Sequence, residues 1–257
     1  MKIAVTGKGG VGKTTVSAIL ARLYAEEGRS VLAADVDPDA NLGLALGFSD
    51  EELDSIIPIS KMKELVLERT GVDAEGIGKF FKINPKVDDI PEKFAKTKNG
   101  VKLLILGTVD VAGAGCVCPE HVILKRLISH LVIRSNDVVI MDMEAGLEHL
   151  GRGTTSFMDS FIVVVEPGTR SIQTYRKIRE LATELGIKKI SAVGNKIRGA
   201  EDEAFIRENV PENDLLGIIH YSDSVIKADR SGTSPFETAG AVVNEIRRIK
   251  EKLEITQ

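Results

Sequence analysis

Short apolar runs alternate along the whole chain with longer segments in which apolar residues recur every three or four positions. The short runs are typical of strands buried in a parallel sheet, and the periodic segments are typical of helices that cover such a sheet. We expect strands near residues 3–5, 31–34, 101–106, 137–142, 161–165, 190–194 and 215–219, and helices at 14–27, from 119, at 171–185 and from 235. This alternation predicts an α/β fold in which a mostly parallel central sheet carries helices on both faces, with right-handed crossovers.

The chain has 257 residues, of which 43% are apolar and 28% charged, an ordinary composition for a globular protein. We find no domain boundary and no internal repeat, so we expect a single domain over residues 1–257. Residues 49–100 have the weakest pattern and are interpreted as an insertion of helices and loops. A helix is expected to begin at Ser49 and another to cover 61–70 and end at Gly71, whereas the lysine-rich residues 93–98 are expected to form surface loops.

Residues 7–15 read GKGGVGKTT between the first expected strand and the first expected helix. They meet the phosphate-loop pattern G-x-x-x-x-G-K-S/T in the structural context that this pattern requires. The glycines allow backbone N–H groups to converge on phosphate, Lys13 holds the terminal phosphates, and the Thr14 hydroxyl binds Mg²⁺. The sequence therefore predicts a P-loop nucleotide site made by Gly9, Gly10, Val11, Gly12, Lys13, Thr14 and Thr15.

Carboxylates follow two of the expected strands. Asp35, Asp37 and Asp39 come directly after the strand at 31–34 and are broken by a proline, which suits a loop beside magnesium and an attacking water. Asp142 ends the apolar strand at 137–142, the Walker B arrangement, in which the carboxylate binds magnesium through water. In open α/β sheets ligands bind at the carboxyl ends of the strands, so these side chains are expected near the P-loop.

The two cysteines, Cys116 and Cys118, are separated by one residue, and in an extended segment they point to the same side. A thiolate metal site normally has four ligands, so two copies of the chain about a two-fold axis would complete a bridging site. His121 is a candidate for an extra ligand. Thiolates suit zinc, nickel, copper(I) or an iron–sulfur cluster, and the alternatives are two unligated thiols or a strained regulatory disulfide.

The charge and composition of the chain argue against a nucleic-acid-binding protein and against a membrane protein. A net charge of −4 and few aromatic residues argue against nucleic-acid binding. No stretch approaches the ~20 apolar residues of a membrane span, and the helix from Pro235 mixes charges of both signs, unlike a membrane anchor. Two closely spaced cysteines fit a reducing compartment, so we expect a cytoplasmic protein.

The loop GKGGVGKTT resembles the deviant Walker A motif of the family that contains MinD, ParA and the nitrogenase iron protein. The resemblance implies a Mg²⁺-dependent ATP hydrolase that works as a homodimer, in which Lys8 crosses to the partner's nucleotide. It also implies that the aspartate before the switch I proline orients the attacking water, which makes Asp37 the first choice and Asp39 the second. Asn195, in the segment GNK after a late strand, is implied to lie on the adenine edge.

The order GKGGVGKTT, DVDPDANLG, GCVCPEH, VVIMDMEAGLEHLGRGT and GNK is similar to that of the CooC-type ATPases, which mature nickel carbon monoxide dehydrogenase. The accessory ATPase of acetyl-CoA synthase is equally compatible. This resemblance implies that nucleotide state gates the binding of Ni²⁺ or Zn²⁺ at the intersubunit cysteines and its transfer to a nickel enzyme client. The alternatives are a MinD- or ParA-like positioning ATPase, and an iron–sulfur scaffold or electron-transfer ATPase of the same superfamily.

Overall fold

The computed structural model describes residues 1–37, 39–71, 82–107, 118–135, 137–144, 158–187 and 189–255. Cys116 and residues 145–157, which include most of the segment MEAGLEHLGRGT on which the resemblance partly rests, lie outside the described residues. The P-loop, both candidate aspartates of switch I, Asp142 and the late strands are all described.

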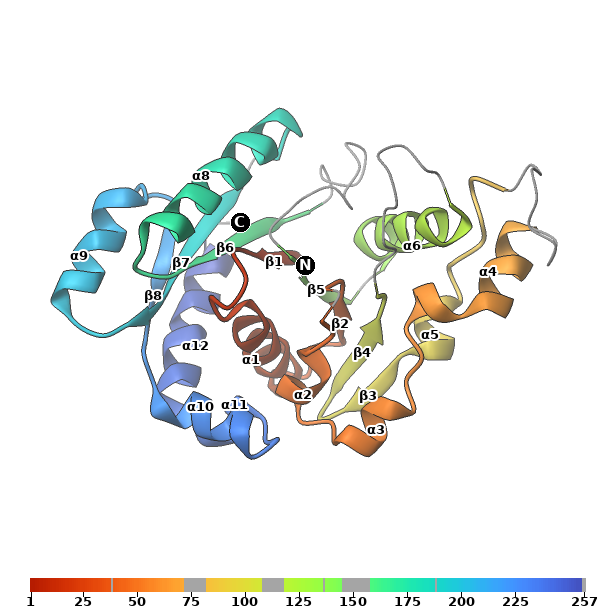
Figure 1. Ribbon diagram of the computed structural model, residues 1–257, viewed down its shortest axis with the longest axis horizontal. Helices are drawn as coiled ribbons and strands as arrows, with labels where there is room; N and C mark the ends of the chain where they lie inside the picture. Colours follow the sequence, from red (N-terminus) through yellow and green to blue (C-terminus); the bar gives the residue numbers. More distant parts are fainter. Residues whose placement is uncertain are drawn as a thin grey trace.

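One sheet runs through the described part of the chain (Figure 1). Its strands stand in the order β3-β4-β2-β5-β1-β6-β7-β8, and β3 alone pairs antiparallel to its neighbour. The strands are β1 (Lys2–Thr6), β2 (Val31–Asp35), β3 (Lys96–Lys98), β4 (Val101–Ile105), β5 (Val138–Asp142), β6 (Ser160–Val165), β7 (Ile190–Ile197) and β8 (Leu215–His220). Strands β1, β2, β5 and β6 are buried on both faces, which explains why they read as unbroken apolar runs.

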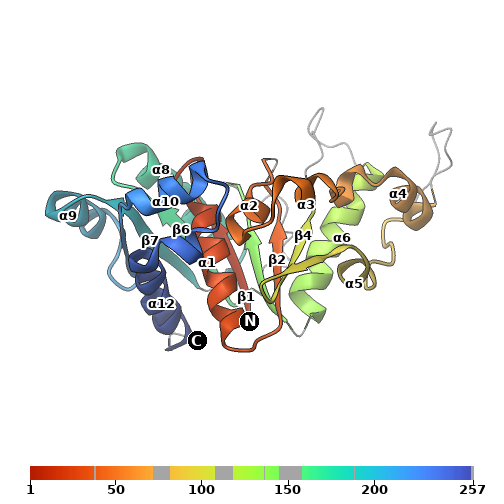
Figure 2. The ribbon, with the colours of Figure 1, turned by 90° about the horizontal axis from the view of Figure 1, so that it is seen from below.

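Helices cover both faces of the sheet, as Figures 1 and 2 show from two directions. Successive residues of β1 point to opposite faces, so Ile3 packs into one apolar core and Ala4 into the other. The first core lies under α1 (Lys13–Glu26), α2 (Leu42–Leu46) and α12 (Gly240–Ile255). The second lies under α4 (Lys63–Thr70), α5 (Ile90–Phe94), α6 (Pro119–Arg134), α8 (Thr169–Glu184) and α9 (Ala200–Asn209).

Shorter helices fill the connections between these layers. They are α3 (Asp50–Asp54), the 3₁₀ turn η1 (Ile59–Lys61), α10 (Asp223–Arg230) and α11 (Pro235–Thr238). Ser49 begins α3 with a capping box, in which its hydroxyl accepts from the Glu52 N–H while the Glu52 carboxylate accepts from the Ser49 N–H. Gly71 ends α4 at φ 72°, as expected of a left-handed C-terminal residue. The helices expected in residues 49–71 are therefore confirmed.

Two expectations are wrong. Part of the lysine-rich segment 93–98, expected as loop, is the edge strand β3, which pairs with β4 through a two-residue turn. Asn99 (φ 50°) and Gly100 (φ 78°) both take the left-handed conformation that such a tight hairpin turn requires. The helix expected from Pro235 is interrupted at Ala239, so that α11 and α12 are separate helices.

Candidate functional site

The P-loop joins β1 to α1 at the carboxyl end of the sheet, and two of its glycines are required by close contacts. A Cβ on Gly7, at φ 145°, would lie 2.4 Å from the carbonyl oxygen of Val164 in β6. A Cβ on Gly12, at φ 97°, would lie 2.3 Å from Nδ2 of Asn195 in β7. Only glycine fits at these positions, because both the backbone angle and the space exclude a side chain. The loop is therefore fixed by β6 and β7 as well as by its own sequence.

Lys13 and Thr14 begin α1 and face the carboxylates that the sequence predicts. Lys13 Nζ lies 3.8 Å from Asp37 Oδ2, and both side chains are largely buried. Thr14 Oγ1 donates a hydrogen bond of 2.7 Å to Asp142 Oδ2. Ser17, one turn further along α1, donates to the other oxygen of Asp142 at 3.1 Å. Sequence reasoning missed Ser17, which lies three residues after Thr14 and so on the same face of the helix.

Asp35 and Asp142 are neighbours in register on β2 and β5, and both are almost fully buried. Burial raises the pKa of Asp142 to about 6, against the opposing effect of its hydrogen bonds from Thr14 and Ser17. Burial raises the pKa of Asp35 to about 7, and the nearby charge of Asp142 adds to this effect. Ionisation of one of these adjacent carboxylates disfavours ionisation of the other. A cation bound beside them would stabilise both in the charged form.

The loop after β2 brings one of the two candidate aspartates to the P-loop. Asp35 fixes the start of this loop, since its two carboxylate oxygens accept from the backbone N–H groups of Asp37 and Leu42 at 3.1 and 3.0 Å. Asp37 Oδ1 in turn accepts from the backbone N–H of Asp39 at 3.1 Å. Asp37 thereby turns its second oxygen toward Lys13, whereas Asp39 is exposed. Of the two candidate aspartates, Asp37 is therefore the one that contacts Lys13 of the P-loop.

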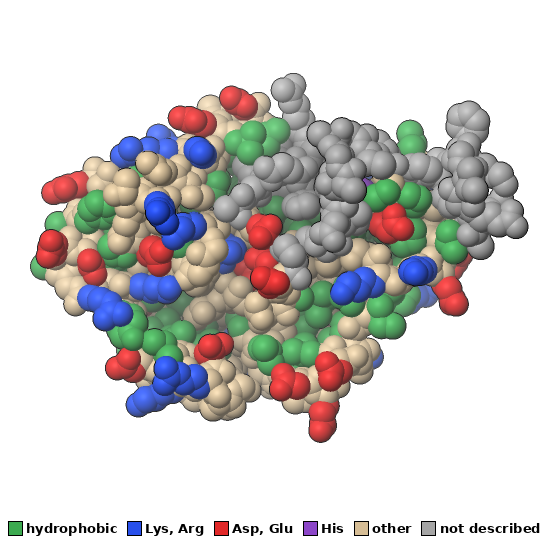
Figure 3. Space-filling model, in the orientation of Figure 1, with side chains coloured by type: hydrophobic (Ala, Val, Ile, Leu, Met, Phe, Trp, Pro, Cys, Tyr) green, Lys and Arg blue, Asp and Glu red, His purple; other side chains and the backbone are tan. Residues whose placement is uncertain are grey.

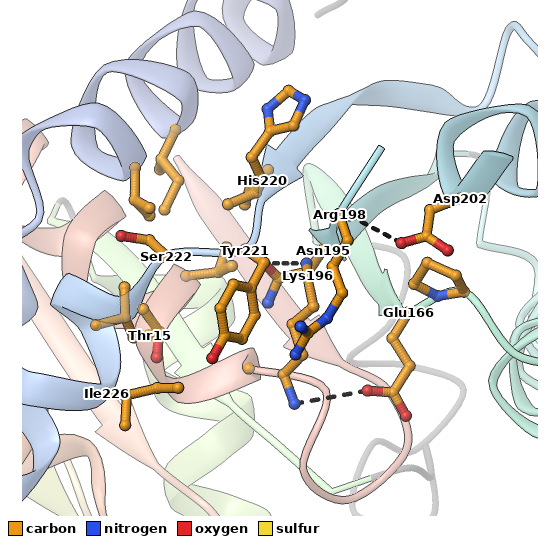
Figure 4. Close-up of a pocket in the computed structure, with 17 residues that line it drawn as sticks. Thr15, Glu166, Asn195, Lys196, Arg198, Asp202, His220, Tyr221, Ser222 and Ile226 are labelled. Carbon is orange, nitrogen blue, oxygen red and sulfur yellow. Dashed lines mark hydrogen bonds and ion pairs between the residues drawn. The ribbon is translucent and has the colours of Figure 1, made fainter. Parts of the chain in front are cut away.

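Two cavities lie beside the P-loop. One, of about 670 Å³, is lined by Lys13, Thr14, Asp37 and Glu144 together with α2 and α10. The other, of about 460 Å³, lies toward β7 and β8 (Figure 4). The two adjoin each other, since they share the lining residues Gly12, Thr15, Lys196, Val225 and Ile226. The first is suited to phosphates and the second to a base.

The second cavity has an aromatic ring and a guanidinium group on one side. The Arg198 guanidinium carbon lies over the Tyr221 ring, 3.9 Å from its centre, which is a cation–π contact. Arg198 also donates its backbone N–H to Asp202 at 2.8 Å, and the aliphatic Val225 and Ile226 complete the lining. His220, Tyr221 and Ser222, which follow one another at the end of β8, line this cavity, and nothing in the sequence pattern singled out Arg198.

Asn195 lines the same cavity, but its amide group is already bonded. Its Nδ2 donates to the carbonyl oxygen of Val11 at 2.7 Å, and its Oδ1 accepts from the backbone N–H of Lys196 at 2.8 Å. Lys196 has a left-handed φ of 61°, and its Nζ donates to the carbonyl oxygen of Gly10 at 2.5 Å. The pair Asn195-Lys196 therefore clamps the P-loop, and the expectation that Asn195 also binds adenine stays a prediction.

Lys8, the second lysine of the loop, points to a carboxylate on its own chain. Its Nζ lies 3.5 Å from Oε1 of Glu166, the residue that follows β6. Lys196 Nζ lies 3.5 Å from the other oxygen of the same carboxylate, and Figure 4 shows this ion pair. Sequence reasoning missed Glu166, because its contact with Lys8 spans more than half of the chain.

The cysteine region is described only in part, because Cys116 lies outside the described residues. Cys118 is half-buried and is the N-cap residue of α6, and Pro119 takes the first helical position as expected. His121, in the first turn, is also half-buried. Within the described ranges no three His, Cys, Asp or Glu side chains gather as a metal site would require, and no helix has the length and apolarity to cross a membrane.

The sequence profile of the CobQ/CobB/MinD/ParA nucleotide-binding domain matches residues 2–236. The chain belongs to this family. The carbon monoxide dehydrogenase accessory protein CooC of Rhodospirillum rubrum is 48% identical over 241 residues, which cover 94% of this chain and 91% of that protein. An ATP-binding protein of Methanocaldococcus jannaschii is 41% identical over 252 residues, which cover 97% and 96%. The resemblance to CooC-type ATPases is confirmed, and the chain is an ATP hydrolase of the P-loop class.

Solved structures of the family confirm the fold class. A ParA family ATPase from Chlorobium tepidum has a TM-score of 0.70 at 17% identity, over 99% of this chain and 98% of that chain. The septum site-determining protein MinD from Pyrococcus horikoshii, solved with Mg-ADP, has a TM-score of 0.67 at 23% identity, over 98% and 96%. The single α/β sheet expected from the alternating pattern is thus the fold of these relatives.

Proposed function

We propose that the chain is an accessory ATPase that matures nickel carbon monoxide dehydrogenase or acetyl-CoA synthase. In this function ATP hydrolysis in a homodimer is coupled to the binding and delivery of a nickel or zinc ion. The observation that carries the proposal is the 48% identity to CooC over 94% of the chain, together with the P-loop geometry. The thiolates require a reducing compartment, so we place the protein in the cytoplasm.

The residues of the first cavity fit a triphosphate with Mg²⁺. Thr14 donates its hydroxyl hydrogen to Asp142, which leaves its oxygen lone pairs available to a cation. Hydroxyl and carboxylate oxygens are the ligands that Mg²⁺ prefers, and Asp142 would act on it through water. When bound, the ion neutralises charge on the phosphate oxygens. Lys13 and the backbone N–H groups of the loop hold the same oxygens in place.

Hydrolysis then depends on how the chain positions water and supplies positive charge. Asp37 lies within reach of Lys13 at the phosphate end of the cavity, and we assign to it the orientation of the attacking water. Lys8 of each subunit would contact the partner's terminal phosphate and stabilise the charge that develops there. Tyr221 and Arg198 would hold the base in the second cavity, with Asn195 and Lys196 linking the base side to the loop.

The cargo metal would bind the thiolates of Cys116 and Cys118. Cys118 stands at the N-terminus of α6, where the positive end of the helix dipole stabilises a thiolate. Each chain supplies two thiolates, so a dimer supplies the four that a closed tetrahedral site takes. Charges of both signs are interspersed over the described face in Figure 3, which supports a protein client rather than nucleic acid.

The test compares the wild-type chain with Cys116→Ala/Cys118→Ala under anaerobic conditions, in the apo, ADP and ATP states. Mass is measured by light scattering, and bound metal by elemental analysis after loading with Ni²⁺ or Zn²⁺. We expect about one metal ion per two chains in the wild type, none in the double variant, and unchanged ATP affinity in both. Lys13→Ala is the reverse control, since it should lose ATP and keep the thiols. An ATP-dependent dimer that never carries metal would contradict the proposal and favour a positioning ATPase.

A further inference from the structure

Glu166 pairs with two lysines beside the phosphate site, Lys8 of the P-loop and Lys196 of β7. Its Oε1 lies 3.5 Å from Lys8 Nζ, and its Oε2 lies 3.5 Å from Lys196 Nζ. The three side chains are only partly buried, with exposed fractions of 27% for Glu166, 38% for Lys8 and 44% for Lys196. One carboxylate thus bridges two cations beside the site that the phosphates would occupy.

The position of Glu166 is fixed by the fold. It directly follows β6, two residues after Val164, whose carbonyl lies against Gly7 of the loop. Its backbone N–H donates to the Ser171 hydroxyl at the start of α8 at 3.0 Å, and Pro167 follows it. The backbone of Glu166 is held in this way beside the P-loop, so its carboxylate stays within reach of both lysines.

The two lysines are held unequally. Lys196 has a second partner, the carbonyl oxygen of Gly10 at 2.5 Å, and its backbone N–H is bonded to Asn195. Lys8 has Glu166 as its one side-chain partner among the contacts of the described residues. If one cation leaves, Lys8 is therefore the one that leaves, and Glu166 remains neutralised by Lys196.

We propose that Glu166 is a positioning residue that keeps Lys8 on its own subunit until a nucleotide-loaded partner competes for it. This inference rests on the proposed function, in which Lys8 acts across the dimer. The exchange costs little because the pair is partly open to solvent, where ion pairs contribute little to stability. Glu166 thus sets the ATP concentration at which dimers form rather than preventing dimers altogether.

The first experiment uses the nucleotide-free monomer and so does not depend on dimerisation. Lys8 is acylated with a water-soluble N-hydroxysuccinimide ester at low ionic strength, and the rate is read by mass spectrometry. An ammonium group must leave its carboxylate before it can lose a proton and attack, so Glu166→Gln should accelerate the reaction at Lys8 about two- to fivefold. The matched control is Glu26→Gln, which breaks an exposed ion pair to Arg247 at the far end of α1 and should leave the rate unchanged. Equal rates in Glu166→Gln and wild type would overturn the pairing.

The second experiment follows dimer formation by light scattering against the concentration of a non-hydrolysable ATP analogue. Glu166→Gln should dimerise at about two- to fivefold lower analogue concentration than wild type or Glu26→Gln. If all three proteins dimerise at the same analogue concentration, the role of Glu166 is overturned while the proposed function stands. Absence of a dimer in all three would overturn the proposed function, and with it the role of Glu166.

Removing Lys8 shows whether the Glu166 carboxylate acts on the bound phosphates directly rather than through Lys8. In a Lys8→Ala background, Glu166→Gln should leave the affinity of the monomer for the ATP analogue unchanged, measured by calorimetry. If the affinity rises as much as the dimer midpoint fell, Glu166 acts by repelling phosphate rather than by holding Lys8, and the proposal is wrong.

Discussion

The P-loop conformation depends on a contact between Gly12 and Asn195, and Gly12→Ala is the change that probes it. The new Cβ would lie 2.3 Å from Asn195 Nδ2 and would sit on a residue with φ 97°. Asn195 would have to move to make room for the new methyl group. The Asn195 side chain would then lose two hydrogen bonds, the one it donates to the Val11 carbonyl oxygen and the one it accepts from the Lys196 backbone N–H.

The expected cost has two parts. An alanine at this backbone angle carries about 1–3 kcal/mol of strain. Each of the two hydrogen bonds of Asn195 contributes about 0.5–1.5 kcal/mol, and its side chain is nearly buried, so little water replaces them. We therefore expect the free energy of unfolding to fall by about 2–6 kcal/mol, which for a chain of this size lowers Tm by roughly 5–20 °C.

The assay is thermal unfolding of the apo protein, followed by circular dichroism, with Gly9→Ala as the control in the same loop. A Cβ on Gly9 would meet no heavy atom within 4 Å, and this residue has no left-handed φ, so a change within about 0.5 kcal/mol is expected. ATP binding, measured where both variants are folded, should be lost in Gly12→Ala. If the two variants unfold within 2 °C of each other, the clamp by Asn195 does not stabilise the loop and the reasoning is refuted.

Three further outcomes are expected around the site. Asp37→Asn should lower kcat for ATP hydrolysis by roughly 10²–10⁴-fold with ATP still bound, and an equal loss in Asp39→Asn would contradict the choice of Asp37. Tyr221→Ala should raise KM for ATP roughly tenfold while Tyr221→Phe does not, because base stacking on an aromatic ring contributes about 1–3 kcal/mol. An unchanged KM in Tyr221→Ala would contradict the placement of the base beside Tyr221. The pKa of Asp35 is about 7 in the folded chain against 3.8 ordinarily, so the folded chain holds an extra proton between these values and loses stability as pH rises through them. From pH 5 to pH 8 the apo wild type should therefore lose roughly 2–3 kcal/mol that Asp35→Asn does not lose, and parallel stability curves would contradict this.

Each part of the site that the sequence predicted is marked by a local pattern within a single strand or turn. Lys13 and Thr14 belong to the loop motif itself, and Asp142 ends an apolar strand. Because parallel strands deliver their carboxyl ends to one edge, the order of the motifs was enough to bring them together. The contacts of Lys13 with Asp37 and of Thr14 with Asp142 follow from this rule.

The parts that sequence reasoning missed are long-range or lack a pattern. The pairing of Lys8 with Glu166 joins residues 158 positions apart, and a single glutamate after a strand gives no periodic signal. Strand β3 has only three residues, all polar, so neither alternation nor an apolar run marks it. The turn Asn99-Gly100 was the available sign of a hairpin, since asparagine-glycine is a strong tight-turn pair.

Asn195 is the most informative difference, because its residue type and location were anticipated while its contacts were not. The resemblance implied a role at the base, and the structure gives the amide to Val11 and Lys196. Both functions can follow from one position, since Asn195 lines the base cavity while it holds the loop. A base that enters this cavity therefore contacts the same segment, Asn195-Lys196, that fixes the P-loop and shares Glu166 with Lys8. The cavity residue Asn195 and Lys8, which we propose acts across the dimer, are therefore linked through three consecutive contacts, from Asn195 to Lys196, from Lys196 to Glu166 and from Glu166 to Lys8. This link is why the rate of Lys8 acylation should be compared with nucleotide present and absent.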